Sequence, residues 1–240
     1  IAAEADLIIA IGGDGTLLYA AHLLAGHDVP LFGVNRGRLG FLTDVSPTEM
    51  LESVDRVLAG DSIEDERTLL GAKLKTRGGT SQSMQALNDV VLQKWETGRM
   101  LDFETSIDGR YVNTHGGDGL VVATATGSTA YALSCGGPIV WPNLDVLVIA
   151  PICPHTLSDR PIIVPSGVSI EVRLIERHNA KAQVTCDGEM LGDLEPGDVL
   201  SIEPTTTRVT LLHPPGYDYF RLLRSKLHWG RGAFAKRDQD

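Results

Sequence analysis

A glycine-rich turn that carries one carboxylate, Gly12-Gly13-Asp14-Gly15-Thr16, offers the clearest chemistry in the sequence. Glycines lack a Cβ atom, so a phosphate group can approach their main-chain N–H groups closely. Gly12, Gly13 and Gly15 are therefore candidate phosphate-binding residues. Asp14 is anomalous there, because its charge would repel a phosphate unless it holds a metal or takes up a proton during a reaction. Alternatively, Asp14 only caps the helix that follows.

A second polar cluster follows the apolar run 119–123 and is rich in small hydroxyl side chains, from Thr124 to Tyr131. Hydroxyl groups at a helix start suit the ribose and phosphate oxygens of a nucleotide, although Thr and Ser also commonly cap helices. Asn88 and Asp89 interrupt another apolar run. A buried Asn-Asp pair needs partners, which are either the neighbouring backbone or the polar edge of a ligand.

The elements around the glycine turn predict an α/β domain. Apolar residues 7–11 read as a strand of a parallel sheet, and Leu17, Leu18, Ala21, Leu24 and Ala25 have helical spacing. A strand at 30–34, a loop at 35–44 and a helix at 47–58 follow, with Ser46 as its cap and Glu49 at the capping-box position. The turn therefore lies at the carboxyl edge of the sheet, where phosphates bind. It differs from a P-loop and from a dinucleotide fingerprint, because neither the Lys-Ser/Thr pair nor the G-x-G-x-x-G spacing is present.

Beyond residue 62 the helical periodicity nearly vanishes, and short alternating segments predict antiparallel strands at 71–76, 86–93, 101–107, 170–175, 182–186, 199–202 and 209–212. A late helix at 218–229, with Phe220, Leu223 and Leu227 on one face, is expected to pack back on the first domain. We expect an α/β domain of residues 1–62 plus about 215–240, and a β-rich domain of residues 63–214.

Composition limits the possible partners. The 240 residues carry a formal net charge of −10, which argues against nucleic acid or an anionic membrane as the main partner. No apolar run reaches the roughly 18 residues that a membrane span needs, and no signal peptide is recognisable. Three cysteines, an odd number without a Cys-x-x-Cys pair, indicate reduced thiols and a cytoplasmic location. Cys153 and His155 are not expected to bind a metal, because the sequence offers no third ligand nearby.

Four motifs in order give the chain a resemblance to the bacterial NAD kinase family: Gly12-Gly13-Asp14-Gly15-Thr16, Asn35-Arg36-Gly37-Arg38-Leu39-Gly40-Phe41-Leu42-Thr43, Asn88-Asp89, and Asp118-Gly119 with Thr126-Gly127-Ser128-Thr129-Ala130-Tyr131. Phosphofructokinases and lipid kinases share the first motif, but the combination is specific and covers essentially the whole chain. The resemblance implies an α/β N-terminal domain, a β-sandwich-like C-terminal domain, and one further β-α unit ahead of Ile1.

The resemblance also implies roles for individual residues. Asp14 resembles the catalytic residue that takes the proton from the 2′-hydroxyl of the adenosine ribose of NAD, and the resemblance places both Asp14 and the adjacent Gly15 among the NAD-binding residues. Asn88 and Asp89 resemble the pair that holds the NAD ribose. Further NAD-binding positions are Arg99, Gly116, Asp118, Thr129, Ala130, Tyr131, Ala132, Leu133, Ser134 and Glu189. Two of these depart from the family pattern, because some members carry Arg at position 116 and Gln is common at position 189.

The expected reaction is phosphoryl transfer from ATP, or from polyphosphate, to NAD, which gives NADP. Both substrates are anionic, so Mg²⁺ or another divalent cation is expected, although its ligands stay unknown. The resemblance implies a homo-oligomer, a dimer or a tetramer, whose subunits share sites. Arg36, Arg38 and Arg160 could contact anions or form ordinary ion pairs. A lipid kinase of related fold and a non-catalytic NAD(P)-binding sensor are the alternatives.

Overall fold

The computed structural model describes residues 4–37, 40–95, 100–176 and 181–229. Two compact units make up the chain: residues 1–66 with 209–240 form the first unit, and residues 67–208 form the second. The long strands β3 (Ile63–Lys75) and β14 (Val199–His213) each contribute residues to both units. Each unit is described by itself.

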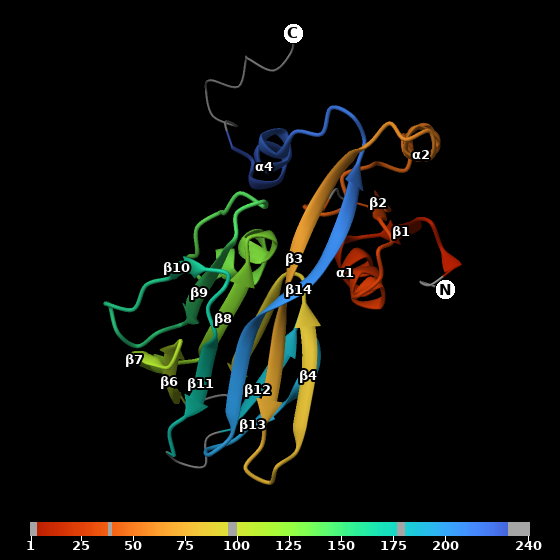
Figure 1. Cartoon of the computed structure of the whole chain (residues 1–240). Coiled ribbons are helices and arrows are strands. Elements are labelled where there is room, and N and C mark those ends of the chain that lie inside the picture. The colour runs from red at the N-terminus through yellow and green to blue at the C-terminus, as the bar shows by residue number, and fades with distance from the viewer. Residues whose placement is uncertain (1–3, 38–39, 96–99, 177–180, 230–240) are drawn as a thin grey trace. The chain divides into compact units, whose positions relative to one another are not determined.

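The first unit is an α/β unit with a parallel sheet. Its elements are β1 (Ile8–Gly12), α1 (Asp14–Leu24), β2 (Leu31–Asn35), α2 (Met50–Leu58), the end of β14, and α4 (Tyr219–Leu227). β1 and β2 pair in parallel, and the end of β14 pairs in parallel with β2 through Leu211 and Leu212. Figure 1 shows α1 directly beside β1 and β2. The strand–turn–helix at the glycine motif is therefore confirmed.

Burial explains how the helices of the first unit are oriented. α1 buries Leu17, Ala21 and Leu24, which recur at helical spacing. α4 buries Tyr219, Leu222 and Leu223, whereas Phe220 is 54 % exposed. The expected Phe220 face is wrong, because the apolar i, i+3, i+4 stripe begins one residue earlier, directly after the cap Asp218.

Helix α2 begins at Met50, three residues later than the sequence predicts. Ser46 and Glu49 nevertheless contact each other as in a capping box: the Ser46 hydroxyl and its main-chain N–H both reach the Glu49 carboxylate. The contacts therefore close a turn ahead of the helix rather than its first turn.

The second unit contains two sheets. One runs β10 (Ile162–Pro165), β9 (Val146–Ile152), β8 (Gly119–Thr124), β5 (Asp89–Lys94), β12 (Ala182–Cys186) and β13 (Glu189–Leu194). The other places β14 between β3, which pairs with β4 (Ser81–Ala86), and β11 (Ile170–Leu174), followed by β6 (Leu101–Ile107) and β7 (Arg110–Gly117). A shared core, with Leu92 and Leu120 from one sheet and Phe103 and Leu200 from the other, makes this unit the expected sandwich.

Some strand predictions need correction. The expected strand 86–93 is divided into β4 and β5 by Leu87 and Asn88. The expected strands 199–202 and 209–212 are one strand, β14, whose residues 203–208 are mostly exposed on both faces and so lack an alternating pattern. β3 begins at Ile63 rather than at residue 71, and β7, β9, β10 and β13 were not predicted.

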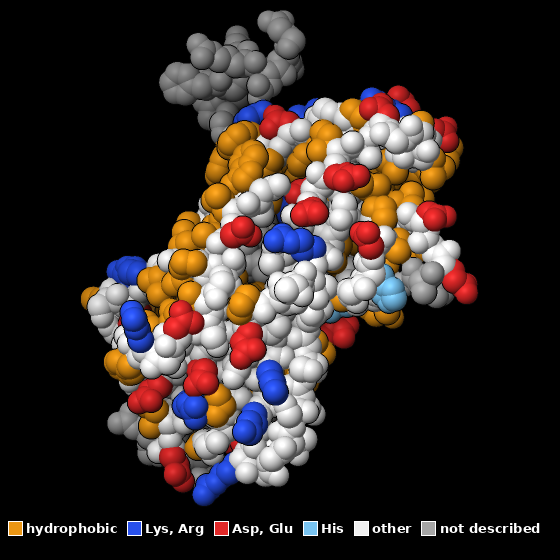
Figure 2. Space-filling model, viewed as in Figure 1, with side chains coloured by type: hydrophobic (Ala, Val, Ile, Leu, Met, Phe, Trp, Pro, Cys, Tyr) orange, Lys and Arg blue, Asp and Glu red, His pale blue; other side chains and the backbone are white. Residues whose placement is uncertain are grey.

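Within the described residues, no helix is both long enough and apolar enough to cross a membrane. On the face shown in Figure 2, acidic and basic side chains are interspersed along the strands. This mixed pattern accompanies the formal net charge of −10 for the whole chain.

Candidate functional site

The glycine turn opens the N-terminus of α1. Gly13 is the N-cap residue of this helix, and Asp14 is its first residue. A Cβ atom added at Gly13 or Gly15 would meet no other atom within 4 Å, so the space above the turn is open. The N–H groups of a first helical turn have no partner within the helix. The turn is therefore suited to bind an anion through its main chain.

The Asp14 side chain binds the loop that follows β2, not the start of its own helix. Its Oδ2 accepts a hydrogen bond from the main-chain N–H of Phe41 (2.8 Å). Its Oδ1 accepts from the N–H groups of Leu42 and Thr43 (3.1 Å each) and from the Thr43 hydroxyl (3.0 Å). The alternative that Asp14 is a helix cap is therefore wrong, because its carboxylate makes no capping bond.

Counting acceptor sites shows which oxygen of Asp14 remains usable. A carboxylate offers about two lone pairs on each oxygen. Among the described residues, three donors bond to Oδ1, whereas Oδ2 accepts from the N–H of Phe41 alone. Oδ2 can therefore accept one more hydrogen bond from a ligand. Gly40 permits this arrangement, since a Cβ there would overlap the Asp14 carboxylate.

The same loop is anchored on its far side by a buried histidine. Asp44 Oδ2 lies 3.1 Å from Nδ1 of His213, and Asp65 Oδ2 lies 3.3 Å from Nε2 of the same ring. The Tyr217 ring stacks on the imidazole with centroids 3.9 Å apart. Burial alone would lower the pKa of His213, but the hydrogen bonds and negative charges of Asp44 and Asp65 outweigh it and raise that pKa.

Replacing His213 by Asn is expected to destabilise the chain by about 3 kcal/mol, because two buried carboxylates lose their cation. A raised pKa means that the charged histidine stabilises the folded state fully below about pH 6.5, and that this contribution is lost as the pH rises through the folded-state value. The difference in unfolding free energy between wild type and His213→Asn should therefore be larger at about pH 6 than at about pH 9. Urea unfolding at both pH values checks this, and a difference that grows with pH would contradict it.

In the second unit, Asn88 and Asp89 lie on a break between β4 and β5 whose backbone is held from two sides. The N–H groups of Leu87, Asn88 and Asp89 donate to the Asp187 carboxylate at 2.7, 2.8 and 2.9 Å. The Thr124 hydroxyl donates to the Leu87 carbonyl (2.6 Å), and the Thr124 N–H donates to the Asn88 carbonyl (2.9 Å). These bonds replace the strand ladder, which explains why the predicted strand is interrupted.

The side chains of this break are available to a ligand to different degrees. The Asn88 side chain is half-buried, and no hydrogen-bond partner is found for its amide among the described residues. Asp89 is buried, and burial followed by the charge of Asp187 raises its pKa from 3.8 to about 7, although the N–H of Tyr131 bonds to it and opposes this rise. The alternative that Asn88 and Asp89 only bond neighbouring backbone therefore does not fit Asn88.

The hydroxyl cluster has a mainly internal role. Thr126 accepts from the Arg67 guanidinium (3.1 Å), and Ser128 donates to the Ala125 carbonyl (2.7 Å) and accepts from the Val140 N–H (3.0 Å). Neither side chain caps the short helices η2 (Thr126–Thr129) and α3 (Tyr131–Ser134). The polar groups left for a ligand are therefore in α3 rather than in the Thr-Gly-Ser segment.

Gly127 brings this segment against the Asn88 break. A Cβ atom at position 127 would overlap the Asn88 carbonyl oxygen and lie 2.7 Å from the Asn88 Cα atom. The Gly127 N–H also donates to the Thr124 hydroxyl (3.1 Å). The second unit thus joins two of the motifs, 88–89 and 126–131, in one cluster. Burial is the main cause of the raised pKa of Tyr131, and the negative charge of Asp118 also raises it.

Other expected ligand residues have less distinctive surroundings. Asp118 forms an ion pair with Lys94 (2.6 Å). Gly116 and Gly117 end strand β7, and the atoms nearest to a Cβ at Gly116 would be the end of Met100 and an Asp102 oxygen, at 3.3–3.4 Å. Glu189 is exposed at the start of β13. Arg99 and Arg38 lie outside the described residues.

The arginines proposed as anion contacts remain open candidates. Arg36 is exposed, and its main-chain N–H donates to the Gly12 carbonyl (2.9 Å). The Arg160 guanidinium donates to the Asp159 carbonyl (2.8 Å). Within the part of the chain that the structure describes, no ion pair is found for either side chain.

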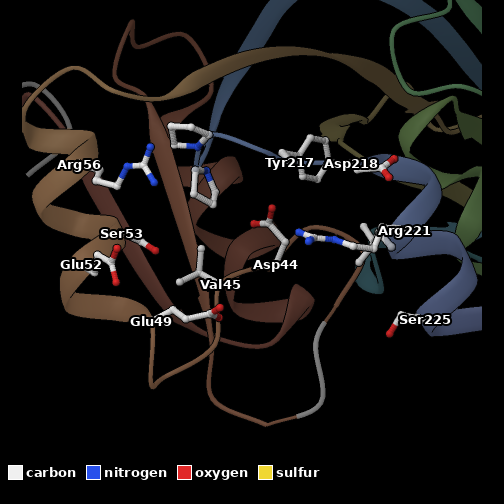
Figure 3. A pocket seen from close by; sticks show the side chains of 13 residues that line it. Asp44, Val45, Glu49, Glu52, Ser53, Arg56, Tyr217, Asp218, Arg221 and Ser225 are labelled. Carbon is white, nitrogen blue, oxygen red and sulfur yellow. The ribbon is translucent and has the colours of Figure 1, made fainter. Parts of the chain in front are cut away.

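Two cavities within the described residues lie apart from the glycine turn and the Asn88 break. A cavity of about 440 Å³ in the first unit is lined by both signs of charge, with Glu52 and Arg56 from α2 and Arg221 from α4 directed into it, beside Asp44 (Figure 3). A cavity of about 250 Å³ in the second unit adjoins the buried pair His115–Asp159. The second cavity is also lined by Arg160, one of the candidate anion contacts, whereas neither of the two is lined by the glycine turn or by Asn88 and Asp89. Over residues 4–37, 40–95, 100–176 and 181–229, no three His, Cys, Asp or Glu side chains are placed to hold a metal ion.

Four residues organise the two clusters: Thr43 and Thr124, which belong to motifs already recognised in the sequence, and Lys94 and Asp187, which sequence reasoning missed. Only Asp187 had a usable local indication, because Asp187-Gly188 between two alternating segments is typical of a hairpin turn. The structure has a hairpin turn there, with φ of +50° at Asp187 and +85° at Gly188.

Comparisons with known proteins point to one family. The family model of the ATP-NAD kinase N-terminal domain matches residues 1–62, and that of the ATP-NAD kinase C-terminal domain matches residues 87–213. The chain is 48 % identical over 228 residues to the NAD kinase of Halorhodospira halophila, covering 94 % of this chain and 74 % of the relative. It is 47 % identical over 231 residues to the NAD kinase of Thiobacillus denitrificans, covering 96 % and 79 %.

Solved structures agree with these relatives. The chain is similar to yeast NADH kinase complexed with NADH, with a TM-score of 0.89 and 28 % identity, over 95 % of this chain and 68 % of that one. It is also similar to an NAD kinase from Archaeoglobus fulgidus in complex with ATP, with a TM-score of 0.75 and 29 % identity, over 93 % and 83 % of the two chains.

Proposed function

Because the chain belongs to the ATP-NAD kinase family, we propose that it is a NAD kinase. It transfers the terminal phosphoryl group of ATP to the 2′-hydroxyl of the adenosine ribose of NAD, which gives NADP, ADP and a proton. The observation that carries the proposal is Asp14, a carboxylate held in a phosphate-binding turn with acceptor capacity left on Oδ2.

Asp14 supplies the chemistry that a ribose hydroxyl needs. An alcohol is a weak nucleophile at neutral pH, and a carboxylate within hydrogen-bond reach can accept its proton while the P–O bond forms. Phosphoryl transfer depends otherwise on positioning and on neutralising charge. In this proposal Oδ2 of Asp14 takes the proton, while the main-chain N–H groups of Gly12, Gly13 and Gly15 bind phosphate oxygens.

The second unit supplies the contacts to NAD. We assign Asn88 and Asp89 to the ribose, since the Asn88 amide has unused hydrogen-bonding groups and Asp89 is an acceptor when ionised. The other proposed NAD-binding residues are Arg99, Gly116, Asp118, the six residues 129–134, and Glu189. The half-buried Tyr131 and the exposed Ser134 supply polar groups within that segment.

We expect a divalent cation, preferably Mg²⁺, to bind to the protein together with the phosphates of the donor. Mg²⁺ is usually bound through one or two carboxylates together with substrate phosphates, so a protein cage of three or more ligands is not required. The cation supplies neutralisation of phosphate charge, which an acidic chain of net charge −10 cannot supply by itself.

We also propose a homo-oligomer, dimer or tetramer, in which neighbouring subunits complete each other's sites, and a cytoplasmic location. The family resemblance supports the first proposal. The second is supported by Cys135, Cys153 and Cys186, which are free thiols, as expected in a reducing compartment.

The proposed function is tested by incubating the protein with NAD, ATP and Mg²⁺ and detecting NADP with an NADP-specific dehydrogenase. NADP should form with all three components and should stop when a chelator removes the cation. Phosphorylation of diacylglycerol in place of NAD would indicate the lipid kinase, and NADP binding without turnover would indicate the sensor. Either result would contradict the proposal.

Donor choice gives a separate prediction from Gly116. An arginine there would add a charged fork able to contact phosphate, whereas glycine adds no side chain, and the family resemblance implies that glycine is more typical of members that accept polyphosphate as well as ATP. We therefore expect NADP to form with inorganic polyphosphate as the sole donor, in addition to ATP. A protein that is active with ATP but gives no NADP with polyphosphate would show that donor choice is set elsewhere.

A further inference from the structure

We propose that Asp187 is a positioning residue for NAD, because it fixes the main chain that carries Asn88 and Asp89. This inference rests on the proposed function, since it assigns the break at 87–89 to the NAD ribose. Asp187 is not one of the residues that the family resemblance assigned to NAD.

Asp187 and Thr124 together bond every main-chain N–H and carbonyl group of residues 87–89. All three N–H groups of residues 87–89 donate to Asp187, and the Asp89 carbonyl accepts from the Asp187 N–H (2.9 Å). Thr124 takes the remaining two carbonyls. One side chain therefore supplies every acceptor that this segment uses. Hydrogen bonds to an ionised acceptor are shorter and stronger than neutral ones.

The turn between β12 and β13 holds Asp187 in place. Asp187 and Gly188 join β12 to β13 with φ of +50° and +85°, which is the two-residue hairpin turn that favours Asp-Gly. β12 pairs with β5 up to the partners Cys186 and Val90. The hairpin therefore holds the carboxylate one residue beyond the last ladder pair, directly against the N–H groups of the break.

The negative charge of Asp187 also acts on Asp89. Asp187 raises the pKa of Asp89 through like charge, in addition to the larger effect of burial. The titratable groups that act on Asp89 or feel its charge are Asp187, Tyr131, Cys135 and Cys186. Removing the charge of Asp187 therefore lowers the pKa of Asp89 below about 7 and favours its ionised form.

The test uses Asp187→Asn and Asp187→Gly in the full chain. Asn and Gly both tolerate positive φ, so the turn is retained, while Asn keeps one acceptor oxygen and Gly keeps none. We expect the KM for NAD to rise about 10- to 100-fold, more for Gly than for Asn, with kcat and the KM for ATP changed much less. In the wild type the KM for NAD should fall as the pH rises through about 7, and in Asp187→Asn this fall should move to lower pH.

Asp108→Asn is the matched control. Asp108 also has a left-handed φ (+49°), precedes a glycine in a hairpin turn, and accepts one main-chain N–H, from Ser169 (2.9 Å). Its substitution removes the same chemical group from a turn of the same kind, so NAD kinetics should stay at the wild-type level.

Three outcomes overturn the inference: an unchanged KM for NAD in both Asp187 variants, an equal rise in Asp108→Asn, or a rise with an unmoved pH profile in Asp187→Asn. Thermal melting checks that each variant is folded. If Asp187→Asn does not fold, the KM for NAD of Asp187→Gly decides the inference. An inactive wild type contradicts the proposed function instead, so the two failures are distinguishable.

Discussion

Asp14→Asn is expected to lower kcat by about 10²- to 10⁴-fold, the usual effect of removing a general base. The amide keeps the shape of the carboxylate but cannot accept the ribose proton. The dissociation constant for NAD should change little, because most of the contacts assigned to NAD lie on other residues and the Asn side chain keeps an oxygen that can accept a hydrogen bond from the ribose hydroxyl. Turnover and NAD binding, measured separately on the folded variant, check the expectation.

A control must separate proton transfer from loop binding, since Asp14 also holds Phe41, Leu42 and Thr43. Thr43→Val removes one of the four donors and leaves the carboxylate intact. Losing one hydrogen bond corresponds to roughly a 2- to 13-fold effect. If Thr43→Val lost as much turnover as Asp14→Asn, Asp14 would act by holding the loop and the proposed role would be wrong.

Gly127→Ala is expected to cost about 3 kcal/mol of unfolding free energy and to raise the KM for NAD. The added methyl group would overlap the Asn88 carbonyl, which is backbone and cannot rotate away. For a chain of this length such a loss lowers the melting temperature by about 6–12 °C. Thermal melting and NAD kinetics measure the two effects.

Gly167→Ala is the matched control for Gly127→Ala. A Cβ at Gly167 would meet nothing within 4 Å, and its φ lies outside the left-handed region. Its stability should stay within about 0.5 kcal/mol of the wild type. Equal melting temperatures for the two variants would mean that the segment at Gly127 does not pack tightly against Asn88.

The sequence predicts those parts of the fold and of the candidate site that depend on local patterns. The glycine turn lies between an apolar run and a helical stripe, so its strand–turn–helix geometry follows from residues 7–25 alone. β14 could not be predicted as one strand, because its exposed middle has no alternation. The prediction that Phe220 lies on the buried face of α4 is wrong for a related reason, since a shift of one residue turns a helical stripe by about 100°.

The residues that organise the two clusters could not be predicted from the sequence. Asp187 reaches N–H groups 98–100 residues earlier in the chain, and Asp14 reaches N–H groups 27–29 residues later. A main-chain donor has no sequence signature, so a carboxylate that binds one cannot be paired with it in advance. The hydroxyl motif was recognisable, but its internal bonds depend on Arg67 and Val140, which only the folded sheet brings near.

The central claim, transfer of a phosphoryl group from ATP to the 2′-hydroxyl of NAD, is tested most directly by locating the phosphate on the product. Phosphorus NMR of the purified product, together with its mass, gives the position and number of the phosphates. We predict one new monoester at the 2′-carbon of the adenosine ribose and one ADP for each NADP formed. A monoester on another hydroxyl, or hydrolysis of ATP without any phosphorylated NAD, would contradict the account.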